Sequence, residues 1–217
     1  LTGWFAFTRR LNFDPRRPES NNGKTLLVLG AGGGVGLAAV DIGVALGFTV
    51  IAAASTAEKR DLAKARGAHH VLDVSGTDVD NAVKEAAKEI SGGGVDVLYD
   101  PVGGSLGETC LRALGEDGTY LVIGFVGGIP KLPANQVLLR NRKVIGVDWG
   151  AWAPPWATGQ GVDLEGHALV EQLDFDSLRI VAVQVHDDRA QAGGGAPPHG
   201  APQMRSKRYQ SFHDSER

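Results

Sequence analysis

The feature that most constrains the fold is a glycine-rich turn between an apolar segment and a helical one. Residues 25–29 read Thr-Leu-Leu-Val-Leu, a continuous apolar run typical of a strand buried on both faces. The turn Gly30-Ala-Gly-Gly-Gly-Val-Gly36 follows directly, and apolar residues then recur at helical spacing over residues 35–46. Gly47 is expected to cap this helix at its C-terminus. The order of strand, glycine turn and helix is typical of a nucleotide-binding unit.

Strand and helix signals alternate along much of the remaining chain. Strands are predicted at residues 49–54, 71–74, 95–99, 119–125 and 143–147, and helices at residues 57–66, 79–90 and 106–114, with a short one ending near 138–141. Helical crossovers of this length join parallel strands. The sequence therefore predicts an α/β fold with a doubly wound, mostly parallel sheet of the Rossmann type.

Composition divides the chain into unequal parts. Residues 23–152 carry the strand and helix pattern and are predicted to form a dinucleotide-binding domain. Residues 1–22 are predicted to form a short amphipathic helix and a loop, too small to fold alone. Residues 153–190 are predicted to hold a partial return segment, with a helix near 164–173 and a strand near 178–185. Residues 191–217 are rich in glycine, proline and polar residues, and a disordered tail is expected there.

Charge and cysteine content argue against several classes of protein. A formal net charge of -3 over 217 residues gives no broad basic field, so binding to nucleic acid or to an anionic membrane surface is not expected. No apolar run approaches the roughly 20 residues of a membrane span. A single cysteine and the lack of a secretory signal favour a reducing, cytoplasmic location. His69 and His70 are adjacent and have no third ligand at metal spacing, so no metal site is predicted.

The glycine turn is the strongest candidate for a ligand site. Glycine allows a tight turn and lets the backbone approach a pyrophosphate, and the amides at the start of the helix attract phosphate. The turn matches the dinucleotide-binding pattern in a variant with alanine first, Ala31-x-Gly33-x-x-Gly36. The alternative is a turn that serves only the close packing of strand and helix.

The end of the second strand indicates which dinucleotide is bound. An acid there would hold the ribose 2′-hydroxyl of NAD, but the chain has Ala54-Ser55-Thr56. Ser55 is expected to donate to a 2′-phosphate and Lys59 to supply its countercharge, so NADPH is predicted in preference to NADH. The alternative for Lys59 is an ordinary solvated lysine. A methyltransferase that binds S-adenosylmethionine is a further alternative, although it also calls for an acid at this point.

Two more loops follow strands at the edge where ligands of open α/β sheets bind. They are Asp-Pro-Val-Gly-Gly at residues 100–104 and Gly-Phe-Val-Gly-Gly at residues 124–128. Pro101, Gly124 and Phe125 are expected to line the ribose and nicotinamide, the alternative being simple turn chemistry. Cys110 is expected in the core. No catalytic residue is predicted, and the motifs of serine hydrolases, P-loop nucleotidases and short-chain reductases are missing from the sequence.

Several of these segments resemble the medium-chain dehydrogenase/reductase superfamily, and within it the zinc-independent NADPH:quinone oxidoreductases. The similar segments are residues 25–40 around the glycine turn, Ile-Ala-Ala-Ala-Ser-Thr-Ala-Glu-Lys at 51–59, Tyr-Asp-Pro-Val-Gly-Gly at 99–104, Ile-Gly-Phe at 123–125 and Val-Asp-Trp-Gly-Ala-Trp at 147–152. The resemblance covers residues 23–152 and is looser over residues 1–22. Val74 stands where some relatives place an aromatic residue against the adenine.

The resemblance implies hydride transfer from NADPH to a quinone or an enone held in a cleft between two domains. It places Ser55 and Lys59 on the 2′-phosphate, Gly124 and Phe125 near the nicotinamide, and a homodimer contact on the strand from Lys143 to Trp149. The resemblance also places five residues of the glycine turn on the pyrophosphate, namely Ala31, Gly33, Gly34, Val35 and Gly36. The family's GroES-like catalytic domain is expected to be missing from this chain, and its final helix and strand are replaced after residue 193. The alternatives are a non-catalytic NADPH-binding or redox-sensing protein and a truncated, inactive fragment.

Overall fold

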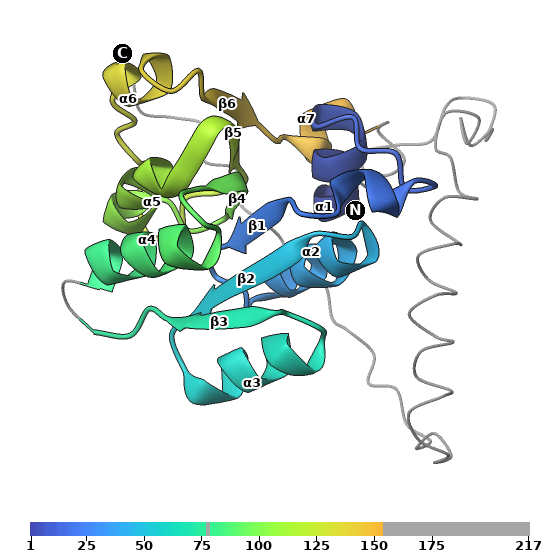
Figure 1. Cartoon of the computed structure of the whole chain (residues 1–217), viewed down its shortest axis with the longest axis horizontal. Coiled ribbons are helices and arrows are strands. Elements are labelled where there is room, and N and C mark those ends of the chain that lie inside the picture. The colour runs from blue at the N-terminus through green and yellow to red at the C-terminus, as the bar shows by residue number, and fades with distance from the viewer. Residues whose placement is uncertain (77–78, 154–217) are drawn as a thin grey trace, which may run out of the picture.

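A single parallel sheet organises the protein. The computed structural model describes residues 1–76 and 79–153, and within them the strand order is β3-β2-β1-β4-β5-β6 (Figure 1). The strands are β1 (Thr25–Val28), β2 (Thr49–Ala54), β3 (His70–Asp73), β4 (Val95–Asp100), β5 (Leu114–Val122) and β6 (Lys143–Gly146). This is the strand order of the Rossmann fold, so the predicted doubly wound sheet is confirmed. The order reverses between β1 and β4, where ligands of such sheets bind.

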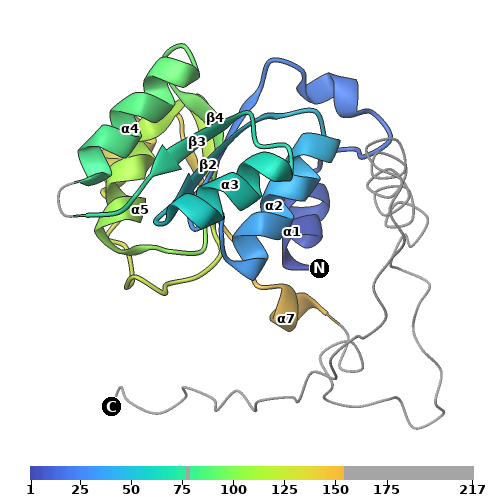
Figure 2. The same cartoon turned by 90° about the horizontal axis from the view of Figure 1, so that it is seen from below.

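Helices cover both faces of the sheet (Figures 1 and 2). The helices α2 (Gly34–Ala45) and α3 (Ala57–Ala65) cover one face, and α4 (Val79–Ile90), α5 (Gly104–Cys110) and the turn η3 (Leu111–Ala113) cover the other. Side chains of β1 alternate between the two layers, with Leu26 on the first face and Leu27 on the second. Because both faces are buried, the strand is apolar throughout, as the sequence indicates.

Most predicted elements are confirmed, and the differences lie at their ends. The glycines Gly47 and Gly67 follow α2 and α3 with φ of +82° and +97°, the left-handed conformation that ends helices. The strand predicted at 119–125 begins earlier, at Leu114, and ends at Val122, with a register shift against β4 between Val95 and Val97.

The edge strand is shorter than predicted. The strand proposed to run from Lys143 to Trp149 ends at Gly146. Asp148 then caps the short helix α7 (Trp149–Trp152), where its Oδ1 accepts the Ala151 N–H at 2.9 Å. An aspartate at this position favours a helix start over further extended chain. The helix α6 (Ala134–Leu138) precedes this strand.

The N-terminal segment packs into the core of the sheet domain. The predicted short helix is present as α1 (Thr2–Trp4), which continues into the π-helical η1 (Phe5–Arg10); the turn η2 (Pro18–Asn21) follows. Phe7 is fully buried and stacks on Tyr99 of β4 with ring centroids 5.8 Å apart. It also lies 6.0 Å from the ring of Phe48. A segment too small to fold alone thus gains its apolar contacts from the sheet.

Several predictions concern residues outside the described part of the chain. These are the helix near residues 164–173, the strand near 178–185 and the tail at 191–217. Among the residues that the structure describes, no helix has the length and apolar character needed to cross a membrane.

Candidate functional site

The glycine turn lies where the strand order reverses, and its geometry requires glycine. Gly30 has a φ of +60°, a conformation that other residues rarely adopt. A β-carbon on Gly36 would collide with the carbonyl oxygen of Gly30. The N–H of Gly33 donates to the same carbonyl at 3.0 Å, and the N–H of Ala31 donates to Ala53 O at 3.0 Å. These contacts close the turn and tie it to β2.

The start of α2 presents amide groups at this turn. Gly33 is the N-cap and has no side chain with which to cap the helix. Helix geometry leaves the amides of Gly34, Val35 and Gly36 without an acceptor in a preceding turn. Gly34 and Val35 are exposed. Such donors, at the positive end of a 12-residue helix, suit a diphosphate. Ala31 and Gly33, by contrast, use their own amides to shape the turn.

Lys59 lies directly over the glycine turn. Its Cβ, Cγ and Cδ atoms occupy the space that a β-carbon on Gly32 would need. The backbone of Lys59 is held at the start of α3, where Thr56 Oγ1 accepts its N–H at 3.3 Å. Ser55 is exposed just before this cap, at the end of β2. The predicted residues Ser55 and Lys59 thus both lie at the carboxyl edge of the sheet, beside the turn.

The structure also shows an ion pair at this corner that was not among the residues predicted from the sequence. Arg60 Nη1 donates to Ala54 O at 3.1 Å and lies 2.8 Å from Asp73 Oδ1. Ala54 and Asp73 are register partners in β2 and β3, so a carboxylate stands beside the end of β2 after all. Hydrogen bonds from Ser75, and then the charge of Arg60, hold the pKa of Asp73 below its usual value. In the sequence, the signal that could have indicated this pair is the aspartate at the end of the third predicted strand, Asp73.

The loops after β4 and β5 lie together at the same edge. The N–H of Gly127 donates to Val102 O at 2.7 Å, and a β-carbon on Gly124 would lie 3.1 Å from the Pro101 carbonyl oxygen. The first of these loops also meets the glycine turn, because a β-carbon on Gly30 would lie 2.9 Å from Val102 Cγ2. Pro101 and Gly124 are therefore placed next to each other, and their loops adjoin the turn.

Asp100 anchors the loop after β4 from inside the domain. Its side chain is buried, and its Oδ1 accepts the N–H groups of Val102 and Gly103 at 2.7 and 2.8 Å. The hydroxyl of Tyr120 donates to Oδ2. Burial, and then the neighbouring Asp100 charge, raise the pKa of Tyr120 above its usual value. Because its carboxylate is engaged in these internal bonds, Asp100 positions the loop.

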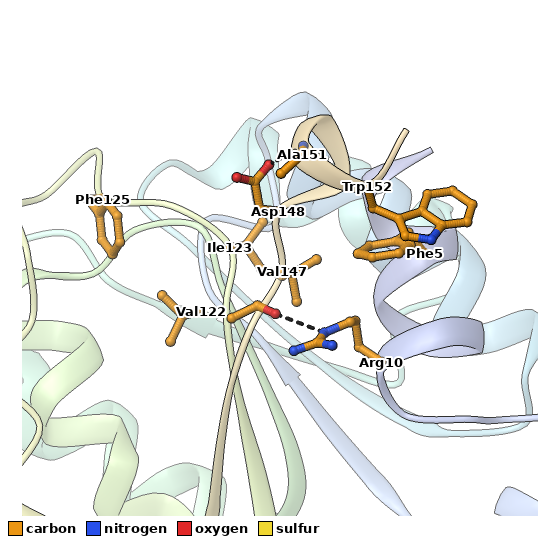
Figure 3. Close-up of a pocket in the computed structure, with 10 residues that line it drawn as sticks. Phe5, Arg10, Val122, Ile123, Phe125, Val147, Asp148, Ala151 and Trp152 are labelled. Atoms are coloured by element: carbon orange, nitrogen blue, oxygen red, sulfur yellow. Dashed lines mark hydrogen bonds between the residues drawn. The ribbon is translucent and has the colours of Figure 1, made fainter. Parts of the chain in front are cut away.

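A cleft of about 690 Å³ opens at the ends of β5 and β6 (Figure 3). Phe125, half exposed, stands on one side, and Trp152 with Phe5 stands on the other, their two rings 4.9 Å apart. Arg10 Nε donates to Gly146 O at 3.0 Å within the cleft. Phe5 and Trp152 come from opposite ends of the described chain, so no local pattern in the sequence could bring them together.

The remaining candidates have structural roles. His69 Nδ1 accepts the Val50 N–H at 3.0 Å and so holds the connection into β3. Cys110 lies in the core, as predicted, and burial raises the pKa of its thiol to about 12. Across residues 1–76 and 79–153, no group of three or more His, Cys, Asp or Glu side chains is arranged to hold a metal ion.

Comparison with known proteins identifies the family. The family model described as zinc-binding dehydrogenase matches residues 34–160. Quinone oxidoreductase-like protein 2 of Bos taurus is 40% identical over 132 residues, which are 60% of this chain and 37% of that protein. The chain thus spans about two fifths of the length of the curated relatives it matches.

Solved structures agree with this assignment. A mycobacterial quinone oxidoreductase is 30% identical with a TM-score of 0.57, covering 67% of this chain and 43% of its own. The quinone oxidoreductase of Thermus thermophilus, also solved in complex with NADPH, is 28% identical with a TM-score of 0.57, covering 73% of this chain and 47% of its own. The chain therefore belongs to the zinc-binding dehydrogenase family, in the quinone oxidoreductase-like branch of the medium-chain dehydrogenase/reductase superfamily.

Proposed function

We propose that this domain binds NADPH along the carboxyl edge of its sheet, and that the protein reduces a quinone or an enone. The observation that carries the proposal is the glycine turn at the reversal of strand order, which only glycine can close and which leaves uncapped amides at the start of α2. A backbone cradle with exposed donors fits a pyrophosphate. The relatives, named as quinone oxidoreductases and a quinone oxidoreductase-like protein, support the reaction class.

The choice of NADPH rests on the residues at the end of β2. Ser55 is exposed there, and the stem of Lys59 lies against Gly32 of the glycine turn. A hydroxyl donor and an ammonium group suit a 2′-phosphate, whereas β2 itself carries no acid to bind a 2′-hydroxyl. These contacts support NADPH over NADH.

The cleft beside Phe125 is the proposed place for the nicotinamide and the acceptor. When bound, the cofactor supplies the hydride, and this chain's residues orient the planar groups and exclude water. The charged groups in the cleft are tied to the backbone, since Arg10 donates to Gly146 O and Asp148 accepts from Ala151. This supports a site that works by positioning, without a general acid or base from the described residues.

A titration of the purified chain tests the proposal. We expect NADPH to bind more tightly than NADH and S-adenosylmethionine not to bind. Lys59→Gln should weaken NADPH by about fivefold and NADH by less than about twofold, because only NADPH presents the extra phosphate. Lys64→Gln is the matched control, since Lys64 lies in the same helix but donates to His69 O at the other end.

A second assay separates an enzyme from a binding protein. NADPH oxidation is followed with a simple quinone and with an enone as acceptor. Turnover supports the reductase, whereas tight NADPH binding without turnover supports the alternative, a non-catalytic or redox-sensing protein. If S-adenosylmethionine binds and NADPH does not, the proposal is wrong.

We also propose that two copies pair through β6. Among the described residues, β6 is an edge strand of the sheet, and its Val144 is 41% exposed. An edge strand with free backbone groups can pair with the same strand of a second copy. Sedimentation should show a dimer that Val144→Lys weakens, while Val126→Lys, at an exposed loop position, should leave it intact.

A further inference from the structure

A carboxylate stands at the corner of the sheet where the ribose of a dinucleotide is expected. Asp73 is the register partner of Ala54, the last residue of β2, and its side chain is 50% exposed. An acid at the end of β2 favours a ribose 2′-hydroxyl in folds of this type, and the same charge repels a 2′-phosphate. Taken alone, Asp73 would therefore work against NADPH.

Arg60 alters the charge of this corner. Its Nη1 lies 2.8 Å from Asp73 Oδ1 and donates to Ala54 O at 3.1 Å, so the guanidinium joins the ends of β2 and β3. Its side chain is only 20% exposed, which indicates a fixed position. A guanidinium has five N–H donors, and these two contacts use one nitrogen. Other donors are then available to a ligand.

We propose that Arg60 is the specificity-determining residue for the 2′-phosphate, because it neutralises Asp73 and adds donors beside Ser55 and Lys59. The inference rests on the proposed function and deepens it, by naming the pair that sets the choice between phosphorylated and unphosphorylated dinucleotide. Without Arg60 the corner carries an unpaired carboxylate and favours a 2′-hydroxyl. With Arg60 the pair carries no net charge, so Asp73 no longer opposes the contact between Lys59 and a 2′-phosphate.

The test uses two adenine nucleotides that differ only at the 2′ position. Binding of 2′,5′-ADP and 5′-AMP to the full chain is measured by calorimetry, so that neither the nicotinamide nor turnover is needed. Arg60→Leu should weaken 2′,5′-ADP about tenfold, as expected for a lost charge at a partly exposed site, and change 5′-AMP by less than about twofold. Arg60→Leu with Asp73→Asn should bind 2′,5′-ADP more tightly than Arg60→Leu alone, because the repulsion is removed.

Arg66→Leu is the matched control. Arg66 follows the same helix and pairs with Asp41 at 2.7 Å, away from the end of β2, so its loss should leave the ratio of the two affinities unchanged. Asp73→Asn alone provides a test that does not depend on Arg60→Leu folding, and it should raise the preference for 2′,5′-ADP.

Each outcome decides a different claim. Equal losses of both nucleotides in Arg60→Leu, or a lower preference for 2′,5′-ADP in Asp73→Asn, overturn the role of Arg60 and leave the proposed function standing. Failure of the unaltered chain to bind NADPH or either half-nucleotide overturns the proposed function, and this inference with it.

Discussion

The hydroxyl of Tyr120 donates to the buried carboxylate of Asp100, and this bond joins β5 to the last residue of β4, where the next loop begins. The other carboxylate oxygen holds the backbone of the same loop. One side chain of β4 therefore holds the loop that adjoins the glycine turn, and the bond makes the stability of the domain sensitive to Tyr120.

Removing the Tyr120 hydroxyl should destabilise the domain. Tyr120→Phe leaves a buried carboxylate oxygen without this donor, and we expect the free energy of unfolding to fall by about 1–3 kcal/mol. Tyr99→Phe is the control, because the Tyr99 hydroxyl is buried with no hydrogen-bond partner among the described residues. Chemical denaturation measures both. Equal losses in the two variants would contradict the role given to the Tyr120–Asp100 bond.

Stability should decline at alkaline pH. Burial raises the pKa of Cys110 from 9.0 to about 12, and burial also raises the pKa values of Tyr99 and Tyr120 above 10.0. The fold favours the neutral forms of these groups. Their contribution to the free energy of unfolding is therefore complete below pH 9 and is lost as the pH rises. Melting temperatures measured from neutral to strongly alkaline pH should fall. Cys110→Ala should remove the part of the decline that begins near pH 9; an unchanged profile would be evidence against this account.

Two glycines in the same turn should respond differently to alanine. Gly36→Ala places a methyl group against the Gly30 carbonyl, and we expect a loss of about 1–3 kcal/mol from the crowding. Gly34→Ala meets nothing within 4 Å and replaces glycine in the first turn of a helix, so stability should be unchanged or slightly higher. Unfolding curves of the two variants give the comparison. A large loss in Gly34→Ala would show that the turn is closed in another way.

The N-terminal segment should contribute to global stability. Phe7 is fully buried between Tyr99 and Phe48, and Phe7→Ala should cost about 3–5 kcal/mol through the cavity left behind. Leu1→Ala, at a position 63% exposed, is the control and should cost little. Cooperative unfolding that is insensitive to Phe7→Ala would mean that residues 1–22 are not part of the folding unit.

Local patterns in the sequence were enough for the sheet and its glycine turn. The apolar runs at Leu26 and Ile51 identify strands buried on both faces, and the glycines between Gly30 and Gly36 identify a turn that other residues cannot close. These signals lie within a few residues of one another, where backbone conformation and burial pattern are set locally. By contrast, the ends of β5 and β6 were predicted less accurately, because strand pairing and the Asp148 cap decide where each strand stops.

The sequence by itself therefore determined the Rossmann fold and the place of its glycine turn. Only the tertiary structure decided which side chains share the site: Lys59 over Gly32, Arg60 with Asp73, and Phe5 with Trp152. Each of these pairs joins different elements, and the distance between their atoms depends on how helices and strands pack. The sequence shows that β2 does not end in an acid. Only the pairing of β2 with β3 shows that Asp73, neutralised by Arg60, lies beside the end of β2.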